Sequence, residues 1–316
     1  MKLLITRPMT AAVEARARAE FDVDFRRETA VMTRPEMLSA LRDYDMVMPT
    51  LGDGFDAGIF AETPKPSCRL LANFGVGFNH IDVAAATASG IAVSNTPGAV
   101  TDATADIALA LILMSARRAA EGERLVRSGN WPGWHPTQML GQHVTGKRLG
   151  VIGMGRIGAA IAQRCHFGFD MQVFYSARSE KTPGFPVTRI ADPVQLAAKV
   201  DFLVVAVPGG SETRHLVDAS VLAAMQPHAH LINIARGEVV QQHALISALQ
   251  KQRIAGAGLD VYEFEPEVPA ELRELSNVTL LPHLGTATDE VRSAMGNMAL
   301  DNVAAFVAGQ PLPNQV

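Results

Sequence analysis

Short apolar runs of strand length alternate with helical patterns along most of this chain of 316 residues. The longest helical pattern, at 102–118, is apolar nearly all round and should be buried on most faces. Parallel strands need a crossover between them, so the alternation is typical of parallel sheets covered by helices. The sequence therefore predicts an α/β fold with doubly wound parallel sheets. The expected strands are 2–6, 46–48, 69–73, 91–94, 148–152, 171–175, 201–207, 230–234, 254–259 and 278–281.

A glycine-rich turn joins the expected strand 148–152 to the helix that follows it. Its sequence, Gly153-Met154-Gly155-Arg156-Ile157-Gly158, has the spacing G-x-G-x-x-G. The first glycine permits the tight turn, the second lets a pyrophosphate approach the backbone, and the third lets helix and strand pack closely. The helix N-terminus then offers free N–H groups to the phosphates. This segment predicts a dinucleotide-binding site.

The end of the next strand indicates which dinucleotide binds. An NAD site usually has an Asp or Glu there, about 20 residues after the glycines, to hold the ribose 2′-OH. Here the strand is followed by Ser176-Ala177-Arg178-Ser179, with no acid at its tip. An arginine suits a 2′-phosphate, and the missing acid removes a repulsive charge. We therefore expect NADP, while Glu180 could still reach the ribose of NAD.

Composition excludes several other classes of protein. The net charge of −4 leaves no basic field for nucleic acid or an anionic membrane. No stretch approaches eighteen apolar residues, and the apolar run at the start is too short for a signal peptide. Cys68 and Cys165 have no metal-binding or redox spacing, so we expect free thiols and a cytoplasmic protein. The histidines show no zinc-like arrangement, and no metal is expected.

Four segments carry a resemblance to a known family. They are 73–82, Asn-Phe-Gly-Val-Gly-Phe-Asn-His-Ile-Asp; the glycine turn 153–158; 233–237, Asn-Ile-Ala-Arg-Gly; and the pair 260–266 and 282–285. In this order the chain resembles the D-isomer-specific 2-hydroxyacid dehydrogenases, and within them the glyoxylate/hydroxypyruvate reductases. The resemblance implies two Rossmann-like domains with the active-site cleft between them. The substrate domain would be 1–98 plus 287–316, and the dinucleotide domain 99–286.

Three residues fit the chemistry of reducing a 2-oxo acid. That reaction needs a cation to bind the carboxylate and polarise the carbonyl, and an acid to protonate the developing alkoxide. Arg236 and His283 each follow an expected strand, at the edge where open α/β sheets bind ligands. Glu265 is the expected partner that favours the charged imidazole. Taken singly, Arg236 could be a structural ion-pair residue and His283 a packing residue; the resemblance implies the catalytic roles.

The resemblance also implies further contacts with substrate and cofactor. The backbone N–H groups of Val76 and Gly77 would bind the substrate carboxylate, and Leu51 would line the pocket. Trp131 or Trp134 resembles a tryptophan that these reductases lend across a dimer, which implies a homodimer. Interface packing is the other interpretation of either tryptophan. Besides the glycine turn and Ser176, Arg178 and Ser179, the implied cofactor contacts are Thr104, Arg156, Ile157, Pro208, Ile234, Asp260 and Gly285.

The expected activity is NADPH-dependent reduction of glyoxylate or hydroxypyruvate to the D-2-hydroxy acid. An NADH-dependent dehydrogenase for a bulkier oxo acid stays open, because the pocket shape is not visible in the sequence. A dinucleotide-sensing corepressor is an alternative from another class, since such proteins can keep the same three residues. A formate dehydrogenase is disfavoured, because the resemblance would then place a glutamine at Glu265.

Overall fold

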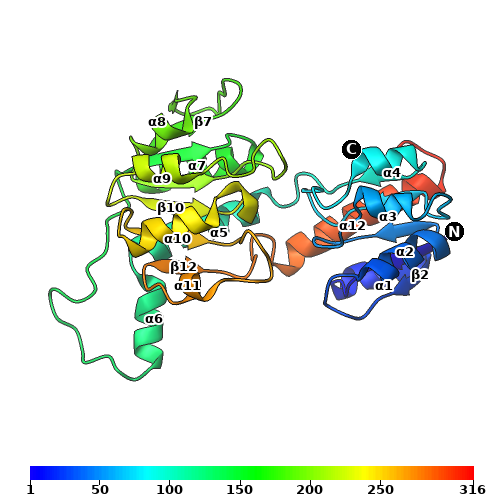
Figure 1. Ribbon diagram of the computed structural model, residues 1–316, viewed down its shortest axis with the longest axis horizontal. Coiled ribbons are helices and arrows are strands. Elements are labelled where there is room, and N and C mark those ends of the chain that lie inside the picture. The colour runs from blue at the N-terminus through cyan, green and yellow to red at the C-terminus, as the bar shows by residue number, and fades with distance from the viewer. The chain divides into compact units, whose positions relative to one another are not determined.

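The computed structural model describes residues 1–316, which form two compact units. Unit 1 comprises Met1–Val100 and Thr286–Val316, and unit 2 comprises Thr101–Gly285. Each unit is a parallel sheet with helices on both faces (Figure 1), which confirms the predicted fold class. The sequence placed the chain crossings at 98–99 and 286–287, whereas the chain leaves unit 1 after Val100 and returns at Thr286.

The sheet of unit 1 has five parallel strands in the order β2-β1-β3-β4-β5. The edge strand β2 was not expected, because its alternating Asp-Val-Asp-Phe has too few apolar residues to stand out. Order reverses between β1 and β3, so the loops after these two strands border the usual ligand position of such sheets. The strands are β1 (Lys2–Ile5), β2 (Asp22–Phe25), β3 (Met46–Met48), β4 (Leu70–Ala72) and β5 (Ala92–Ser94).

Two helices cover one face of this sheet and three cover the other. On the first face Val13 of α1 and Leu300 of α12 pack in one apolar cluster. These helices approach so closely that a Cβ on Gly296 would lie 2.5 Å from Val13 Cγ2. The second face buries Leu41, Ile59 and other side chains in a separate cluster. The helices are α1 (Ala11–Glu20), α2 (Arg34–Asp43), α3 (Ala57–Ala61), α4 (Val83–Ala88) and α12 (Asp289–Val307).

The sheet of unit 2 has seven parallel strands in the order β12-β11-β10-β9-β6-β7-β8. From β8 inwards this is the 3-2-1-4-5-6 order of dinucleotide-binding sheets, with its reversal between β6 and β9. The edge strand β8 was not expected, since it is short and polar. The strands are β6 (Arg148–Ile152), β7 (Gln172–Ser176), β8 (Val187–Arg189), β9 (Phe202–Val205), β10 (His230–Asn233), β11 (Gly256–Leu259) and β12 (Val278–Leu280).

Helices α5 and α7 cover one face of this sheet, and α8, α9 and α10 cover the other. Ala108 and Leu111 of α5 are fully buried, as its apolar sequence predicted, although Leu113 is 36% exposed. No helix of the chain is long and apolar enough to cross a membrane. The main helices are α5 (Thr101–Ala116), α7 (Arg156–Phe169), α8 (Pro193–Ala197), α9 (Ala219–Ala224) and α10 (Gln242–Gln250). Short turns are η1 (Gly237–Val239) and α11 (Ala270–Arg273).

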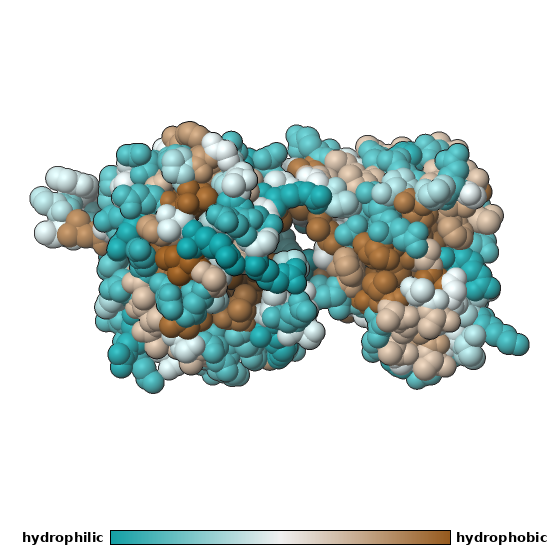
Figure 2. Space-filling model, turned by 90° about the horizontal axis from the view of Figure 1, so that it is seen from above, coloured by the Kyte–Doolittle hydropathy of each residue, from teal (hydrophilic) through white to brown (hydrophobic).

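An arm projects from the body of unit 2 (Figure 1). It consists of α6 (Ala119–Arg127), none of whose residues is buried, and the loop 128–143. Figure 2 shows the outer end of this arm as the narrow extension at the left. Trp131 and Trp134 are 49% and 79% exposed on it. Within a single chain these tryptophans therefore lack the packing that large aromatic side chains normally find.

A fully buried carboxylate holds the loop that follows β3 in unit 1. Asp53 Oδ2 accepts from Thr6 Oγ1 at 2.7 Å and from the Thr50 N–H at 2.9 Å. Its Oδ1 accepts from the Met32 N–H at 3.0 Å. These bonds join the ends of β1 and β3 and fix the backbone on both sides of Leu51. The loop at the sheet reversal is therefore rigidly placed.

We predict that Asp53→Ala lowers the free energy of unfolding by about 3 kcal/mol, because buried donors lose their acceptor. Asp56→Ala is the matched control: Asp56 is exposed and caps α3 through the Ile59 N–H, so its loss should cost about 1 kcal/mol. Urea denaturation of the full chain measures both. Equal losses for the two variants would contradict the role given to Asp53.

Candidate active site

The expected catalytic side chains of unit 2 lie on loops at one edge of its sheet. Arg236 follows β10, Asp260 follows β11 and His283 follows β12. The glycine turn beginning at Gly153 follows β6. Because all these strands are parallel, their carboxyl ends share an edge, and the loops emerge together.

His283 and Glu265 form a hydrogen-bonded pair. The distance from His283 Nδ1 to Glu265 Oε2 is 2.9 Å, and the two side chains are 30% and 31% exposed. A carboxylate facing Nδ1 keeps the proton on that nitrogen, so Nε2 is the atom that gains or loses a proton. No protein group bonds to Nε2. The pair can therefore transfer a proton to a ligand through Nε2.

The environment of Glu265 keeps it ionised. Burial acts to raise the pKa of Glu265, but its hydrogen bonds and the charges of His283 and Arg236 together lower the pKa. The Tyr262 N–H adds a hydrogen bond of 2.9 Å to Glu265 Oε1. Arg236 also favours the charged form through its electrostatic attraction. An ionised Glu265 in turn stabilises the positive charge of a protonated imidazole.

Asp260 holds the loop that carries His283. Its Oδ1 accepts from the Leu284 N–H at 2.6 Å, and its Oδ2 from the Gly285 N–H at 2.8 Å. Its carbonyl accepts from the His283 N–H at 2.9 Å, and His283 has a φ of 55°, which few non-glycine residues adopt. Burial raises the pKa of Asp260 despite these bonds. The sequence predicted a cofactor contact for Asp260; this holding role was not anticipated.

Arg236 has no ion pair in the protein. Its Nη1 donates to the Ala235 carbonyl at 2.8 Å, while its buried Nε has no hydrogen-bond partner. Burial lowers the pKa of Arg236, against the attraction of Glu265 and Glu238. A half-buried guanidinium with unused donors favours binding of an anion such as a carboxylate. The structural ion-pair interpretation of Arg236 is therefore wrong.

The loops of Arg236 and Glu265 pack directly on each other at Gly237. A Cβ built on Gly237 would lie 1.8 Å from the Tyr262 carbonyl carbon, so only glycine fits. On the other side, Asn233 Nδ2 donates to the Arg236 carbonyl at 3.0 Å. Arg236 is thus fixed relative to the loop that carries Glu265.

The glycine turn fits a dinucleotide. Gly153 has a φ of 99°, and a Cβ on Gly158 would lie 2.0 Å from the Gly153 carbonyl oxygen, so both positions need glycine. A Cβ on Gly155 would meet nothing within 4 Å, which leaves open space where a phosphate would approach. Gly155 is the N-cap of α7, a helix of 14 residues whose N-terminus has no side-chain cap. Its first N–H groups are therefore available to phosphate oxygens.

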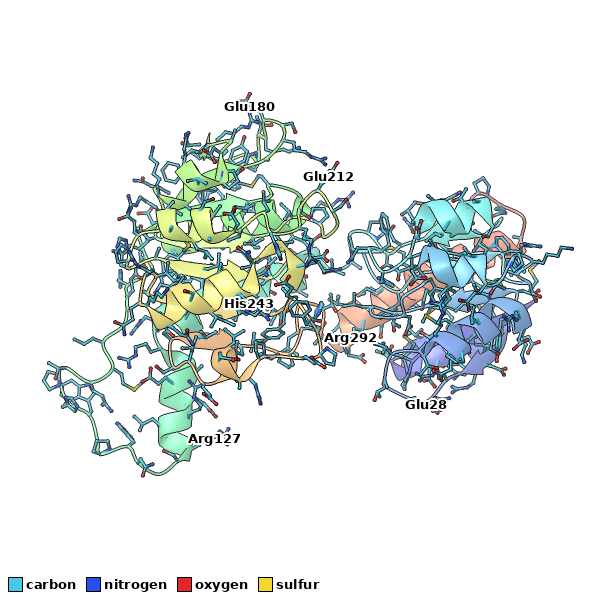
Figure 3. The ribbon with its side chains drawn as sticks, in the orientation of Figure 1. Glu28, Arg127, Glu180, Glu212, His243 and Arg292 are labelled. Atoms are coloured by element: carbon cyan, nitrogen blue, oxygen red, sulfur yellow. The ribbon has the colours of Figure 1, made fainter.

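Arginines gather at the end of β7, where the 2′ group of the adenosine ribose is expected. Arg178 is 94% exposed and lies 3.3 Å from Glu212. Arg189, which the sequence did not single out, donates to the carbonyls of Ala177 at 2.9 Å and Arg178 at 3.2 Å. In Figure 3, Glu180 points outwards from this end of the unit. The acid beside Arg178 is therefore Glu212, from the loop after β9.

The other expected contacts of unit 2 are placed as follows. Thr104 Oγ1 donates to the Gly285 carbonyl at 3.1 Å, which links α5 to the His283 loop. Ile234 is 6% exposed and belongs to the apolar core beneath the edge. Pro208 is exposed in the loop after β9. Ser176, the last residue of β7, is buried, and its Oγ donates to the Ala191 carbonyl at 2.7 Å. Ser179 is exposed in the loop that follows β7, and Trp131 and Trp134 are on the arm.

In unit 1, the expected substrate residues lie on two neighbouring loops. Val76 and Gly77 follow β4, and Leu51 follows β3; all three are half-buried. A bridge between Thr50 and Phe74 joins the two loops.

Comparisons with known proteins agree with this arrangement. Residues 109–285 match the model of the D-isomer specific 2-hydroxyacid dehydrogenase, NAD binding domain. Glyoxylate reductase from Pyrococcus furiosus is 40% identical over 100% of this chain and 95% of its own length. The chain belongs to the D-isomer specific 2-hydroxyacid dehydrogenase family. The residues that match the NAD binding domain model, 109–285, all lie within unit 2.

Solved structures of this family share the fold over the whole chain. An NADPH-dependent glyoxylate/hydroxypyruvate reductase from Sinorhizobium meliloti, in complex with NADP and malonate, has a TM-score of 0.87 at 35% identity. The match covers 100% of this chain and 96% of that one. A glyoxylate reductase from Paecilomyes thermophila has a TM-score of 0.88 at 30% identity, covering 100% and 98%.

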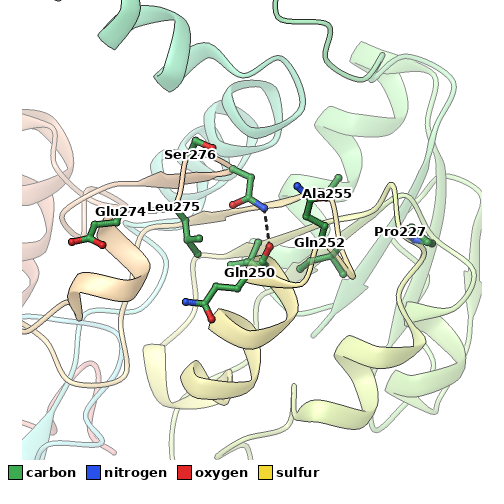
Figure 4. Close-up of a pocket in the computed structure, with 10 residues that line it drawn as sticks. Pro227, Gln250, Gln252, Ala255, Glu274, Leu275 and Ser276 are labelled. Atoms are coloured by element: carbon green, nitrogen blue, oxygen red, sulfur yellow. Dashed lines mark hydrogen bonds between the residues drawn. The ribbon is translucent and has the colours of Figure 1, made fainter.

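One cavity of this dehydrogenase lies away from the catalytic edge. It has a volume of about 510 Å³ and lies beside α10, between the segments that enter β10, β11 and β12 (Figure 4). Gln250, Ser276 and Asn277 line it, and Asn277 Nδ2 donates to the Leu249 carbonyl at 3.4 Å. Ligands of parallel α/β sheets bind at the carboxyl ends of the strands, so this hollow at the amino ends is not the active site.

We predict that Gly237→Ala destabilises the dehydrogenase by about 3 kcal/mol, because the added Cβ overlaps the Tyr262 backbone. Gly168→Ala is the control, since a Cβ there meets nothing within 4 Å in α7. That change should be neutral or slightly stabilising. Thermal melting separates the two, and similar melting temperatures would contradict the tight packing at Gly237.

Proposed function

We propose that this dehydrogenase uses NADPH to reduce glyoxylate or hydroxypyruvate to the D-2-hydroxy acid. The observation that carries the proposal is the pairing of two groups at one sheet edge. Arg236 is a half-buried cation without an ion pair, and His283 is held by Glu265 with its Nε2 free. A cation and a proton donor at the same sheet edge suit a 2-oxo acid, which carries a carboxylate beside a carbonyl.

In this mechanism Arg236 binds the carboxylate and polarises the carbonyl oxygen. When bound, the reduced nicotinamide supplies the hydride to the carbonyl carbon. The proton on His283 Nε2 passes to the carbonyl oxygen, which becomes the hydroxyl of the product. Glu265 stabilises the imidazolium before this transfer, and Asp260 keeps the His283 loop in place. We propose that the N–H groups of Val76 and Gly77 bind the same carboxylate.

Two arginines support the choice of NADPH. Arg178 is exposed and available to a 2′-phosphate, and Arg189 adds a second cation that steadies the same loop. On cofactor binding, Arg178 would exchange its contact with Glu212 for one with the phosphate, since a dianionic phosphate is the stronger partner of a guanidinium. The Sinorhizobium meliloti relative, described as NADPH-dependent, was solved with NADP.

We further propose that the enzyme is a homodimer joined through the arm. The support is the exposure of Val126, Trp131, Trp134 and Leu140 on one projecting segment. Apolar side chains gathered in this way mark an interaction surface. Sedimentation equilibrium tests the proposal, and a monomer at micromolar concentration would contradict it.

We predict that His283→Ala lowers kcat roughly 10²- to 10⁴-fold, because the proton donor is lost. His243→Ala is the control: His243 is exposed on α10 and lies outside the catalytic loops (Figure 3). Steady-state oxidation of NADPH with glyoxylate measures both. A loss below about tenfold for His283→Ala would reject its role as general acid.

We predict that Glu265→Gln moves the pH dependence of reduction to lower pH. The lowered pKa of Glu265 reflects its attraction to the imidazolium, and this attraction acts equally in the other direction. Without the carboxylate, the charged form of the proton donor loses its counter-charge, so kcat/KM begins to fall at lower pH. Glu267→Gln, at an exposed position of the same loop, should leave the profile unchanged. An unmoved profile for Glu265→Gln would refute the pairing.

We predict that Arg178→Ala raises KM for NADPH roughly ten- to a hundredfold, through loss of charged hydrogen bonds to the phosphate. KM for NADH should change little, because NADH lacks that phosphate. Arg253→Ala, at an exposed site beyond α10, serves as the control. Equal effects on both cofactors, or no effect on either, would show that Arg178 does not recognise the 2′-phosphate.

A further inference from the structure

A buried asparagine holds the glycine-rich loop that follows β4 in unit 1. Asn73 is fully buried, and its Nδ2 donates to the carbonyl of Gly75 at 3.0 Å and to that of Gly77 at 3.1 Å. Its Oδ1 lies 3.0 Å from His80 Nε2, which fixes the orientation of the amide. One side chain thus ties two carbonyl groups of the loop to the end of β4.

A second asparagine, at the end of β5, holds the carbonyl between these two. Asn95 Nδ2 donates to the Val76 carbonyl at 2.9 Å. Its own backbone N–H donates to the Asn314 carbonyl at 3.1 Å, so Asn95 is anchored to the C-terminal segment. The Thr96 N–H adds a bond of 3.0 Å to the Gly75 carbonyl. The carbonyls of Gly75, Val76 and Gly77 are therefore all turned towards donors within unit 1.

Peptide geometry then decides where the N–H groups of this loop point. In a planar trans peptide, the N–H of a residue points opposite to the carbonyl of the residue before it. The N–H groups of Val76, Gly77 and Phe78 therefore face away from the asparagines. No acceptor in the protein bonds to any of them, and the three residues are only half-buried. Successive free N–H groups of this kind favour binding of an anion.

We propose that Asn95 and Asn73 are positioning residues for the substrate carboxylate, and that the Phe78 N–H is a third donor to it. The inference rests on the proposed function, which assigns a carboxylate to Val76 and Gly77. Neither asparagine touches the substrate; each acts by holding a carbonyl so that the following N–H is aimed at the carboxylate. Asn95 acts on the Gly77 N–H alone, because it holds only the Val76 carbonyl.

Removal of the Asn95 amide should therefore weaken carboxylate binding selectively. In Asn95→Ala the peptide between Val76 and Gly77 loses its anchor and turns more freely. In Asn95→Asp the side chain keeps its size but faces the Val76 carbonyl with a negative oxygen, which repels it. Asn79→Ala is the matched control, since Asn79 is exposed close to the same loop and its side chain makes no hydrogen bond.

The test uses the full chain with NADPH and oxalate, a two-carbon analogue of glyoxylate. Calorimetry gives the oxalate Kd of the NADPH complex, and steady-state kinetics give KM for glyoxylate and for NADPH. We expect both Asn95 variants to weaken oxalate binding and to raise KM for glyoxylate roughly ten- to a hundredfold. This is the effect of losing one hydrogen bond to a charged group, here from the Gly77 N–H to the carboxylate. KM for NADPH and the melting temperature should match those of the wild type and Asn79→Ala.

The proposal is overturned if oxalate Kd in both Asn95 variants stays within twofold of the wild type. It is also overturned if melting temperature and NADPH binding fall in parallel with oxalate binding, since that would show a general structural role. Absence of oxalate binding to the wild type overturns it too. If the wild type binds oxalate yet reduces no oxo acid, the proposed function fails, while the ratio of oxalate Kd values still decides the role of Asn95.

Discussion

All seven strands of unit 2 run in one direction, so every loop that leaves a carboxyl end emerges at the same edge of the sheet. This constraint lets residues far apart in the sequence share one site. The parallel strand direction alone brings the glycine turn after β6 and the loops after β10, β11 and β12 to that edge. No specific contact between two of these loops is needed for this. Two contacts then fix the positions of these loops relative to one another. Gly237 lets the loop of Arg236 pack on the backbone of Tyr262, and Asp260 binds the N–H groups of the His283 loop.

The two basic side chains at this edge, His283 and Arg236, differ in how their charges are balanced. His283 has a counter-charge within the protein, because Glu265 Oε2 lies 2.9 Å from its Nδ1. Arg236 forms no ion pair, and burial makes its charge costly despite the attraction of Glu265 and Glu238, as its lowered pKa shows. An anionic ligand that pairs with Arg236 would remove that cost. In the proposed reaction, Arg236 thus favours binding of a carboxylate, and His283 supplies the proton to the carbonyl oxygen.

The sequence predicted those features that a local pattern encodes. The central strands, the glycine turn and the strand-end positions of Arg236 and His283 follow from apolar runs and the residues that come directly after them. The edge strands β2 and β8 were not predicted, because these two are half-exposed and carry polar residues such as Asp24 and Thr188. Features that depend on contacts between residues far apart in the sequence were also not predicted. Arg189 behind Arg178, Asp260 holding the His283 loop and Asn95 on the Val76 carbonyl are each separated by many residues from their partners. No periodicity or motif spacing reveals such pairs.

The most direct test of the proposed chemistry is the initial rate of NADPH and NADH oxidation by the wild-type protein with glyoxylate, hydroxypyruvate, pyruvate and phenylpyruvate. The arrangement of Arg236, His283 and the arginines at the end of β7 predicts the highest kcat/KM for NADPH with glyoxylate or hydroxypyruvate. A preference for NADH or for phenylpyruvate would keep the reaction but overturn the proposed cofactor or substrate. Absence of turnover with every pair would contradict the proposal that the residues at this edge of the sheet reduce a 2-oxo acid.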